Sequence, residues 1–417
     1  QRQMCIRDRS EGCFTDDFKD TPFWWDAAPP AQGDLGPLPN RVDVAVVGAG
    51  YTGLHAAIQT ARAGLETVIL EAGGLGTGCS SRNGGQISTS IKPSYNKLRS
   101  RFGPDLAKRI LREGQASRDF TERFIADEKL DADFRSVGRF VGAHCTRSYE
   151  SLANEITAPN PAFETGAYMV SPDDMGAELG TKVYQGGCVF PRHASLDPGK
   201  YHKALVDTAR SSGVKIHTNT NVTEFERARA GFRVVTSKGN QRSAKLVVAT
   251  NGYSGQLSPW LQRRVIPIGS YIIATEPVPR GLMDRLFPTD RVVSDTRRLV
   301  YYYRPSPDRR RIIFGGRVSL NETDPRKSGP MLLQDLIRIF PDLARTRISH
   351  SWMGRVAYTF DTLMHTGEDR GLYYAIGYCG SGVGMAGYLG MKMGRKIVEL
   401  TDAGTAVSYT HLRAHET

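Results

Sequence analysis

A glycine-rich turn between a buried strand and a helix is the feature that most constrains how this chain folds. The apolar run at residues 42–47 predicts a strand buried on both faces of a parallel sheet, and Gly-Ala-Gly-Tyr-Thr-Gly follows it at 48–53. Apolar residues at helical spacing predict a helix over 51–63, and a second strand over 67–70 ends at Glu71, 18 positions beyond the last glycine. These segments predict one βαβ unit of the kind that binds a dinucleotide.

Each glycine of this turn meets a separate demand of a bound dinucleotide. Gly48 permits a tight turn, Gly50 lets the backbone approach a pyrophosphate, and Gly53 lets the helix pack closely on the strand. The helix N-terminus then offers unpaired N–H groups and the positive end of its dipole to the phosphates. Glu71 is placed to accept hydrogen bonds from ribose hydroxyls, and a carboxylate there disfavours the 2′-phosphate of NADP.

Three further segments favour FAD over NAD. The polar run Ser-Ser-Arg-Asn-Gly-Gly-Gln at 80–86 stands where a simple NAD domain would continue with helix and strand. It predicts a loop along an elongated dinucleotide, with a flexible surface loop as the alternative. Ala-Thr-Asn-Gly at 249–252 closes another strand, and a glycine-dense turn at 377–384 opens the last helix. The N-terminus of that helix is suited to stabilise negative charge on a flavin ring.

Composition excludes several classes of protein. Of the 417 residues, 40% are hydrophobic and 24% charged, which is ordinary for a globular chain of roughly two to three domains. No apolar run approaches the ~18 residues of a membrane helix, and the six cysteines form no C-x-x-C pair, so we expect a cytoplasmic protein without a metal site. The net charge of +12 comes without a basic block or aromatic–basic interleaving, so nucleic acid is not expected as a partner.

The order of the motifs along the chain resembles a known family. A strand, GAGYTG, a helix and LEA are followed by SSRNGGQ, ASLDPGKY, VVATNGY, W-x-G-x-x-A-Y-T-x-D and YCGSGVGM. This order is similar to that of the FAD-dependent D-amino-acid oxidase (DAO) superfamily over residues 23–400, and within it to the γ-glutamylputrescine oxidoreductase-like subgroup. The resemblance implies an FAD cofactor, a two-domain fold, and oxidation of a C–N bond in an amine or amino acid.

The fold class that follows is α/β, with a Rossmann-type FAD-binding domain interrupted by an α+β substrate domain on a large mixed or antiparallel sheet. Strand-rich segments at 265–276, 291–304 and 311–318 predict that sheet, and helices are expected from Pro198 and over 383–400. We predict the FAD-binding domain at 41–100, 188–258 and 352–404, the substrate domain at 101–187 and 259–351, and non-native ends at 1–10 and 407–417, which resemble translated adapter sequence.

Carried over motif by motif, the resemblance implies where FAD would lie. The first glycine turn and Glu71 would hold the ADP half, the 81–86 loop would run toward the ring, and the 380–383 turn would face the pyrimidine side of the flavin. Val222 would contact adenine through its backbone. The predicted cofactor contacts are Gly48, Ala49, Gly50, Tyr51, Thr52, Gly53, Glu71, Ala72, Ser81, Arg82, Asn83, Gly84, Gly85, Gln86, Val222, Thr250, Asn251, Gly252, Gly380, Ser381, Gly382 and Val383.

Two departures from the family pattern bear on cofactor and substrate. Families with covalent flavin place a Cys four residues after the Trp of W-x-G, or a His in the loop after the second strand. Here Val356 and the His-free loop predict non-covalent FAD. Many α-amino-acid oxidases carry an Arg at that same position to clamp the substrate carboxylate. Val356 cannot do so, and Arg355 is one residue away. We therefore expect an amine or N-substituted substrate whose far end is bound elsewhere.

Four residues of the predicted substrate domain and its border are candidates for positioning the substrate: Tyr271, Tyr303, Arg304 and Trp352. Aromatic rings suit an amine through shape and cation–π contact. Packing within the sheet is the alternative for each ring.

The expected reaction is hydride transfer to flavin N5 from the carbon attached to nitrogen, giving an imine that hydrolyses to an aldehyde. O2 or another electron acceptor would then take the electrons. Three alternatives stay open: a D-amino-acid or glycine-type oxidase or dehydrogenase, a tRNA-modifying flavoenzyme of the same fold, and a non-catalytic flavin-binding subunit.

Overall fold

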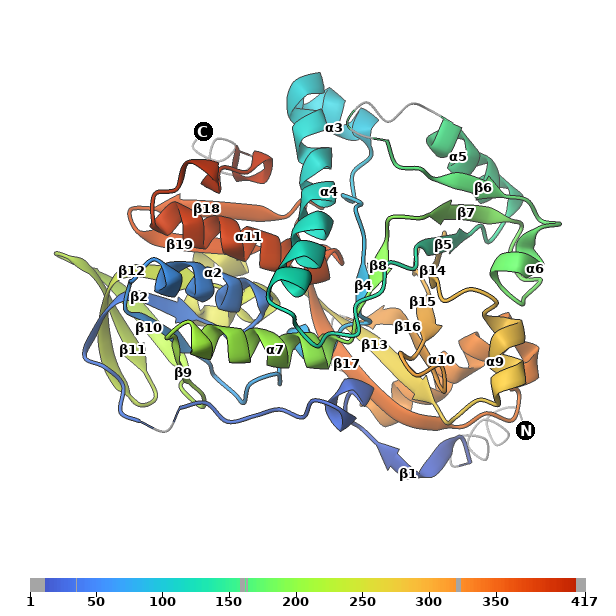
Figure 1. Ribbon diagram of the computed structural model, residues 1–417, viewed down its shortest axis with the longest axis horizontal. Helices are drawn as coiled ribbons and strands as arrows, with labels where there is room; N and C mark the ends of the chain where they lie inside the picture. The colour runs from blue at the N-terminus through green and yellow to red at the C-terminus, as the bar shows by residue number, and fades with distance from the viewer. Residues whose placement is uncertain (1–11, 35, 158–161, 163, 320–323, 410–417) are drawn as a thin grey trace.

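The protein is built around two large β-sheets that lie side by side (Figure 1). The computed structural model describes residues 12–34, 36–157, 162, 164–319 and 324–409. Within this described part, eight strands form the smaller sheet and nine the larger one, and no helix combines the length and apolarity needed to cross a membrane. The predicted non-native end at 1–10 and most of the one at 407–417 lie outside the described residues.

The smaller sheet has a parallel centre in the order β9–β3–β2–β12–β19. An antiparallel meander of β10 and β11 continues from the first half of β12, and β18 pairs antiparallel with β19. The strands are β2 Arg41–Val47, β3 Thr67–Leu70, β9 Lys215–His217, β10 Val222–Ala228, β11 Gly231–Thr236, β12 Gly239–Val248, β18 His365–Asp369 and β19 Leu372–Ile376. Because parallel strands end at one edge, the carboxyl ends of β2, β3 and β12 meet there.

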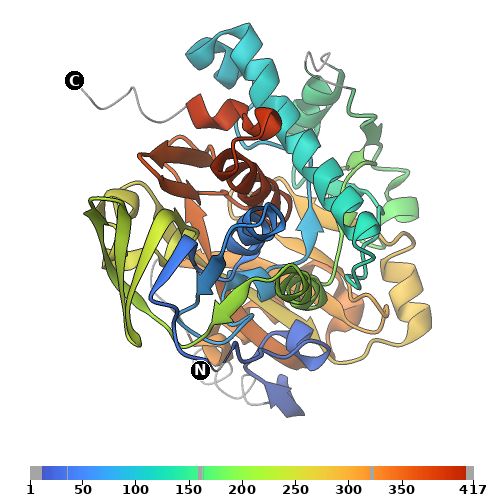
Figure 2. The same ribbon diagram turned by 60° about the vertical axis from the view of Figure 1, so that its left-hand side comes forward.

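Helices cover one face of this sheet (Figure 2). They are α2 Tyr51–Arg62, α4 Pro104–Asp127, α7 Pro198–Ser211 and α11 Gly382–Ile397. Val44 and Val46 of β2 pack into the helical layer, whereas Ala45 and Val47 pack on the side of the meander. Burial on both faces is what the continuous apolar run of β2 predicts.

The larger sheet is mostly antiparallel, in the order β1–β17–β13–β16–β15–β14–β5–β7–β6. Its strands are β1 Phe14–Lys19, β5 Arg139–Gly142, β6 Tyr168–Val170, β7 Gly187–Phe190, β13 Ile266–Thr275, β14 Val292–Asp295, β15 Tyr302–Pro305, β16 Ile312–Ser319 and β17 Ile348–Tyr358. One face packs against α6 Met175–Glu178, α9 Arg280–Leu286 and α10 Pro325–Ile339 in a core that includes Phe140 and Tyr303. The opposite face carries Ile272, Tyr302 and Trp352.

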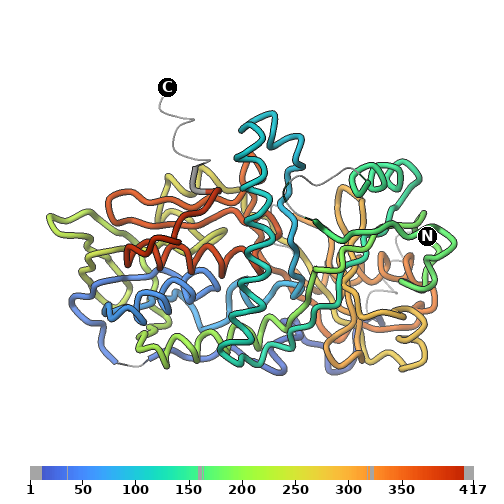
Figure 3. The backbone as a smooth tube through the Cα atoms, turned by 45° about the horizontal axis from the view of Figure 1, so that its top comes forward, coloured from blue at the N-terminus to red at the C-terminus, as the bar shows by residue number. Residues whose placement is uncertain are grey.

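Short segments join the two sheets. The strands β4 Gln86–Ile87 and β8 Ala194–Ser195 pair with each other between them, and α4 stands across the junction (Figure 3). The other described α-helices are α3 Tyr95–Phe102, α5 Thr146–Thr157 and α8 Pro259–Gln262.

The predicted α/β class is confirmed, and both predicted sheets are present. The helix predicted over 383–400 ends earlier, at Ile397, because Glu399 adopts a positive φ of 61° and the Leu400 N–H turns back to the Arg395 carbonyl. The segment predicted as one strand-rich stretch at 291–304 is two strands, β14 and β15, which pair with each other. The predicted domain limits stay a prediction.

Glycines on α11 let this helix lie directly against α2. A Cβ on Gly390 would overlap the carbonyl oxygen of Thr52, and a Cβ on Gly394 would lie 2.7 Å from the carbonyl oxygen of Ala56. Backbone therefore meets backbone along this contact, which leaves almost no room for adjustment.

We predict that Gly390→Ala destabilises the fold by about 1–3 kcal/mol, because the added methyl pushes α2 away from α11. Chemical denaturation measures the effect. Gly176→Ala is the matched control, since Gly176 lies in α6 with nothing within 4 Å of an added Cβ. Equal stability of the two variants would contradict the packing argument.

His55 makes the helical layer sensitive to acid. Its ring is fully buried on α2, and Nε2 lies 3.0 Å from the Tyr201 hydroxyl. Burial, followed by the charge of Arg62, lowers the pKa of His55 to about 3. The folded protein therefore keeps His55 neutral where the unfolded chain protonates it.

A lowered histidine pKa costs stability as the pH falls below about 6.5, because only the unfolded state takes up the proton. From pH 7 to pH 5, we expect His55→Gln to lose about 2 kcal/mol less stability than the wild type. Urea titrations at the two pH values measure the difference. Identical losses would show that His55 does not titrate in this way.

Candidate functional site

A cavity of about 730 Å³ opens at the carboxyl ends of β2, β3 and β12. This is the edge at which open α/β sheets bind ligands, and the volume suits a small-molecule or cofactor site. Its wall comes from all four predicted motifs and from the last residues of β17.

The first glycine turn has the backbone geometry that the sequence predicted. Gly48 adopts a φ of 101°, which disfavours a side chain, and a Cβ on Gly53 would overlap the Gly48 carbonyl oxygen. Gly50 is the N-cap of α2 and makes no side-chain cap, so the first turn of α2 faces the cavity with few partners for its N–H groups. Ser80 reaches in, where its Oγ accepts from the Tyr51 N–H at 3.2 Å.

Glu71 fixes the turn as well as lining the cavity. One carboxylate oxygen accepts from the Ala49 N–H at 2.7 Å, and the other accepts from the Gly73 N–H at 3.1 Å. His202 holds the opposite side of Ala49, with Nε2 2.8 Å from the carbonyl oxygen. Each carboxylate oxygen keeps a further lone pair for a ribose hydroxyl.

The loop after the 3-10 turn η2 Cys79–Ser81 is held by three buried or half-buried indoles. Trp24 Nε1 donates to the Asn83 carbonyl at 2.9 Å, Trp25 Nε1 to Ser81 Oγ at 2.8 Å, and Trp352 Nε1 to the Arg82 carbonyl at 2.8 Å. The Asn83 amide closes the loop on itself by bonding the Gly85 N–H and the Ser80 carbonyl. The sequence alternative of a flexible surface loop is not what the structure shows.

A second glycine turn completes the cavity opposite the first. Gly380, with a φ of 94°, and Gly382 open α11 onto the cavity. Tyr378 links the two turns, because its buried hydroxyl lies 2.5 Å from Thr52 Oγ1 on α2. The N-termini of two long helices therefore face one cavity, which suits an elongated anionic ligand.

These residues fit FAD. The first glycine turn and the N-terminus of α2 suit the pyrophosphate, and the carboxylate of Glu71 suits the ribose. The second glycine turn and the N-terminus of α11 suit the electron-rich ring. Cys79 also lines the cavity, but burial raises the pKa of its thiol to about 11, so the thiol stays protonated and reacts poorly. Val356 lines the wall at the position where a covalent family member would carry cysteine.

The structure separates the predicted cofactor residues into two groups, whose contacts with the cofactor stay a prediction. Those that line the cavity are Gly48, Gly50, Tyr51, Thr52, Glu71, Ala72, Asn83, Val222, Thr250, Asn251, Gly380, Gly382 and Val383. Those that are not part of this lining are Ala49, Gly53, Ser81, Arg82, Gly84, Gly85, Gln86, Gly252 and Ser381. Arg82, for example, turns away, with Nε donating to the Thr77 carbonyl and the guanidinium over the Trp25 ring.

The four predicted substrate-positioning residues do not line this cavity. Tyr271 and Tyr303 belong to the core on the far face of the larger sheet, where the Tyr303 hydroxyl lies 3.0 Å from that of Tyr184. Arg304 donates to the carbonyls of Gly85 and Leu196, and Trp352 to that of Arg82. Arg304 and Trp352 thus support the cofactor loop from behind.

Sequence reasoning missed several residues of the site. Three cavity-lining residues lie inside or beside the quoted motifs, namely Tyr378, Ser80 and Cys79. Their position next to the motif glycines was the sequence signal that could have identified them. Tyr302, one residue before Tyr303, lies on the face of the larger sheet that Trp352 shares, with its hydroxyl 2.8 Å from Ser270 Oγ. Strand alternation from Tyr303 would have indicated it, but the choice of face needs the sheet order.

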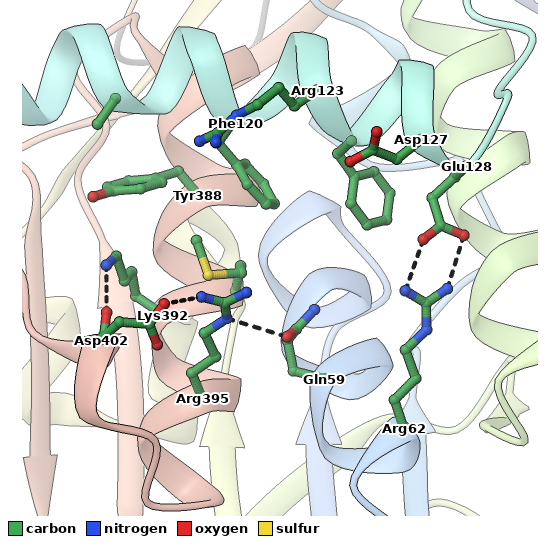
Figure 4. Close-up of a pocket in the computed structure, with 13 residues that line it drawn as sticks. Gln59, Arg62, Phe120, Arg123, Asp127, Glu128, Tyr388, Lys392, Arg395 and Asp402 are labelled. Carbon is green, nitrogen blue, oxygen red and sulfur yellow. Dashed lines mark hydrogen bonds and ion pairs between the residues drawn. The ribbon is translucent and has the colours of Figure 1, made fainter.

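A second cavity, of about 590 Å³, lies among α2, α4, α11 and the 3-10 turn η6 Thr401–Ala403 (Figure 4). Two ion pairs occupy its wall: Arg62 pairs with Glu128 at 2.7 Å, and Arg395 pairs with Asp402. None of its lining residues in the described chain is a glycine. It therefore lacks the features that equip the first cavity for a dinucleotide.

Comparisons with known proteins agree with this geometry. Residues 43–395 match the DAO family, described as FAD dependent oxidoreductase. The chain is 29% identical to the protein OrdL of Rhizobium meliloti over 88% of its own length and 86% of the relative's. It is also 29% identical to γ-glutamylputrescine oxidoreductase of Escherichia coli over 82% and 80% of the two lengths. The crystal structure of glycine oxidase from Geobacillus kaustophilus superposes with a TM-score of 0.73 at 19% identity, covering 86% of this chain and 95% of that one.

We predict that Gly50→Val abolishes FAD binding, because its side chain would enter the space in front of α2, and that Glu71→Ala weakens binding about tenfold or more by removing a charged acceptor. Flavin content after purification and titration of apoprotein with FAD measure both effects. Gly281→Val is the control, because an added Cβ there meets nothing within 4 Å. Full flavin content in the Gly50 and Glu71 variants would refute the assignment.

Proposed function

Because the chain belongs to the DAO family of FAD-dependent oxidoreductases, we propose that it oxidises a C–N bond in an amine or an N-substituted amino compound such as γ-glutamylputrescine. When bound, FAD supplies the two-electron acceptor for the hydride that leaves the carbon next to nitrogen. The nitrogen lone pair forms the C=N bond, and water converts the resulting imine to an aldehyde and free amine.

The observation that carries this proposal is the aliphatic side chain of Val356 in the cavity wall. The next residue back, Arg355, holds its guanidinium 5.5 Å from the centre of the Tyr253 ring. Arg355 also lines the cavity, but it stands beside this ring rather than at the position of Val356, and the absence of a guanidinium at Val356 favours a substrate that carries no carboxylate on the reacting carbon. The relative named γ-glutamylputrescine oxidoreductase supports the same substrate class.

The chain's own residues would prepare the amine by excluding water. A neutral nitrogen is required, since its lone pair drives the transfer, and a desolvated site lowers the pKa of a bound ammonium. The face that carries Tyr302 and Trp352 also carries the apolar side chains of Ile272 and Ile313. Burial raises the pKa of the Tyr302 hydroxyl, which therefore stays protonated and can donate a hydrogen bond.

The four predicted substrate-positioning residues would act indirectly, by holding the elements that surround the site. Arg304 and Trp352 hold the backbone of the cofactor loop, while Tyr271 and Tyr303 brace the sheet from behind. The two-domain division, a cytoplasmic location and O2 or another soluble molecule as electron acceptor complete the proposal.

Anaerobic mixing of the holoenzyme with γ-glutamylputrescine is expected to bleach the long-wavelength flavin absorbance, whereas D-alanine and glycine are expected to leave it unchanged. Repeating the reaction in air distinguishes an oxidase, which regains its colour and consumes O2, from a dehydrogenase. Bleaching by glycine or D-alanine alone would establish the amino-acid alternative. Salt-sensitive binding of tRNA without amine bleaching would favour a tRNA-modifying enzyme.

A further inference from the structure

Arg139, on strand β5 of the larger sheet, has no carboxylate partner among the residues that the structure describes. Side chains alternate along β5, so that Phe140 enters the far core and Arg139 points to the opposite face, which Tyr302 and Trp352 share. A hydrogen bond verifies this direction, because Arg139 Nη2 donates to Gln86 Oε1 at 3.1 Å. Gln86 ends the loop that lines the cofactor cavity through Ser80 and Asn83.

The guanidinium of Arg139 is only partly satisfied. Its Nε is buried and has no hydrogen-bond partner, and no carboxylate in the described part of the chain pairs with it. Burial lowers the pKa of Arg139 to about 10, so the group stays charged at neutral pH. An unpaired charge in such surroundings is unfavourable unless a ligand supplies the partner.

The surroundings of Arg139 do not offset this charge. His193 is buried nearby, with Nε2 3.2 Å from Thr89 Oγ1 and with Nδ1 unpartnered. Burial, followed by the charges of Arg139 and Arg118, holds the pKa of His193 well below its usual value, so its ring is neutral. Arg118 itself is paired with Glu122.

Arg304 shows that a buried arginine in this protein can be satisfied without a ligand. Its guanidinium donates to three carbonyls, those of Gly85, Leu196 and Pro305, and Asp197 adds a compensating charge. Arg139 has neither feature, although both side chains donate to neighbouring residues of the same loop, Arg139 to Gln86 and Arg304 to Gly85. The difference is the second observation that points to a missing anion at Arg139.

We infer that Arg139 binds a carboxylate at the far end of the substrate, with Gln86 orienting the guanidinium. This inference rests on the proposed function, and it makes the substrate an amine that bears a carboxylate remote from the oxidised C–N bond. Arginine presents a planar set of donors that matches a carboxylate with two hydrogen bonds. Val356 cannot bind a carboxylate next to the reacting carbon, whereas Arg139 on β5 would bind one at the other end of the substrate.

Binding of pentanoate to the holoenzyme tests the inference without turnover. Pentanamide, which has the same shape without the charge, is the matched probe. We expect pentanoate to perturb the flavin spectrum and raise the melting temperature of the wild type, and Arg139→Met to weaken its binding about tenfold or more. Arg139→Lys is expected to lie between the two, and pentanamide to bind neither protein measurably.

Arg135→Met is the control variant, because this exposed arginine lies four residues earlier and faces Asp290 at 3.6 Å. It is expected to bind pentanoate as the wild type does, and flavin content confirms that each variant is folded. Equal pentanoate affinity in Arg139→Met and the wild type, or no binding to the wild type, overturns the inference. If Arg139-dependent binding is found but no amine bleaches the flavin, the carboxylate site stands and the proposed reaction falls.

Discussion

A close backbone contact lies between α2 and the turn that precedes it. Gly53 has no Cβ, and for that reason the first turn of α2 can touch the carbonyl oxygen of Gly48. This approach directs the N-terminus of α2 at the cavity, and α11 is then packed onto α2 through Gly390. The second glycine turn is thereby aimed at the same space. One steric condition sets the positions of both helix ends that would face the cofactor.

The glycine turn and Glu71 were predictable from the sequence because their interactions are local. A strand, a tight turn and a helix fix one another within about 30 residues, and the spacing alone places the carboxylate. The indoles of Trp24 and Trp352 were not predictable in this way. Both donate to the same loop from sequence distances of 59 and 270 residues, and nothing in the local pattern of either residue indicates the partner.

The substrate-facing residues were harder to predict for a related reason. The segment at 301–303 holds three tyrosines, and a shift of one residue moves a ring to the other side of the sheet. Which side faces the cofactor depends on α9 and α10 covering the far face, and this is a property of the tertiary structure. The same holds for Arg139, whose unusual feature is a buried Nε without a hydrogen-bond partner in the described chain rather than any motif around it.

Strand β17 has a mechanical consequence. It is hydrogen-bonded along its length to β13 in the larger sheet, yet its last residues, Arg355 to Ala357, form part of the cofactor cavity wall. A rigid rotation of one sheet against the other would displace these wall residues and break their contacts with a bound cofactor. The shared strand thus couples the two sheets, and a rigid rotation between them is disfavoured for as long as the cofactor is bound.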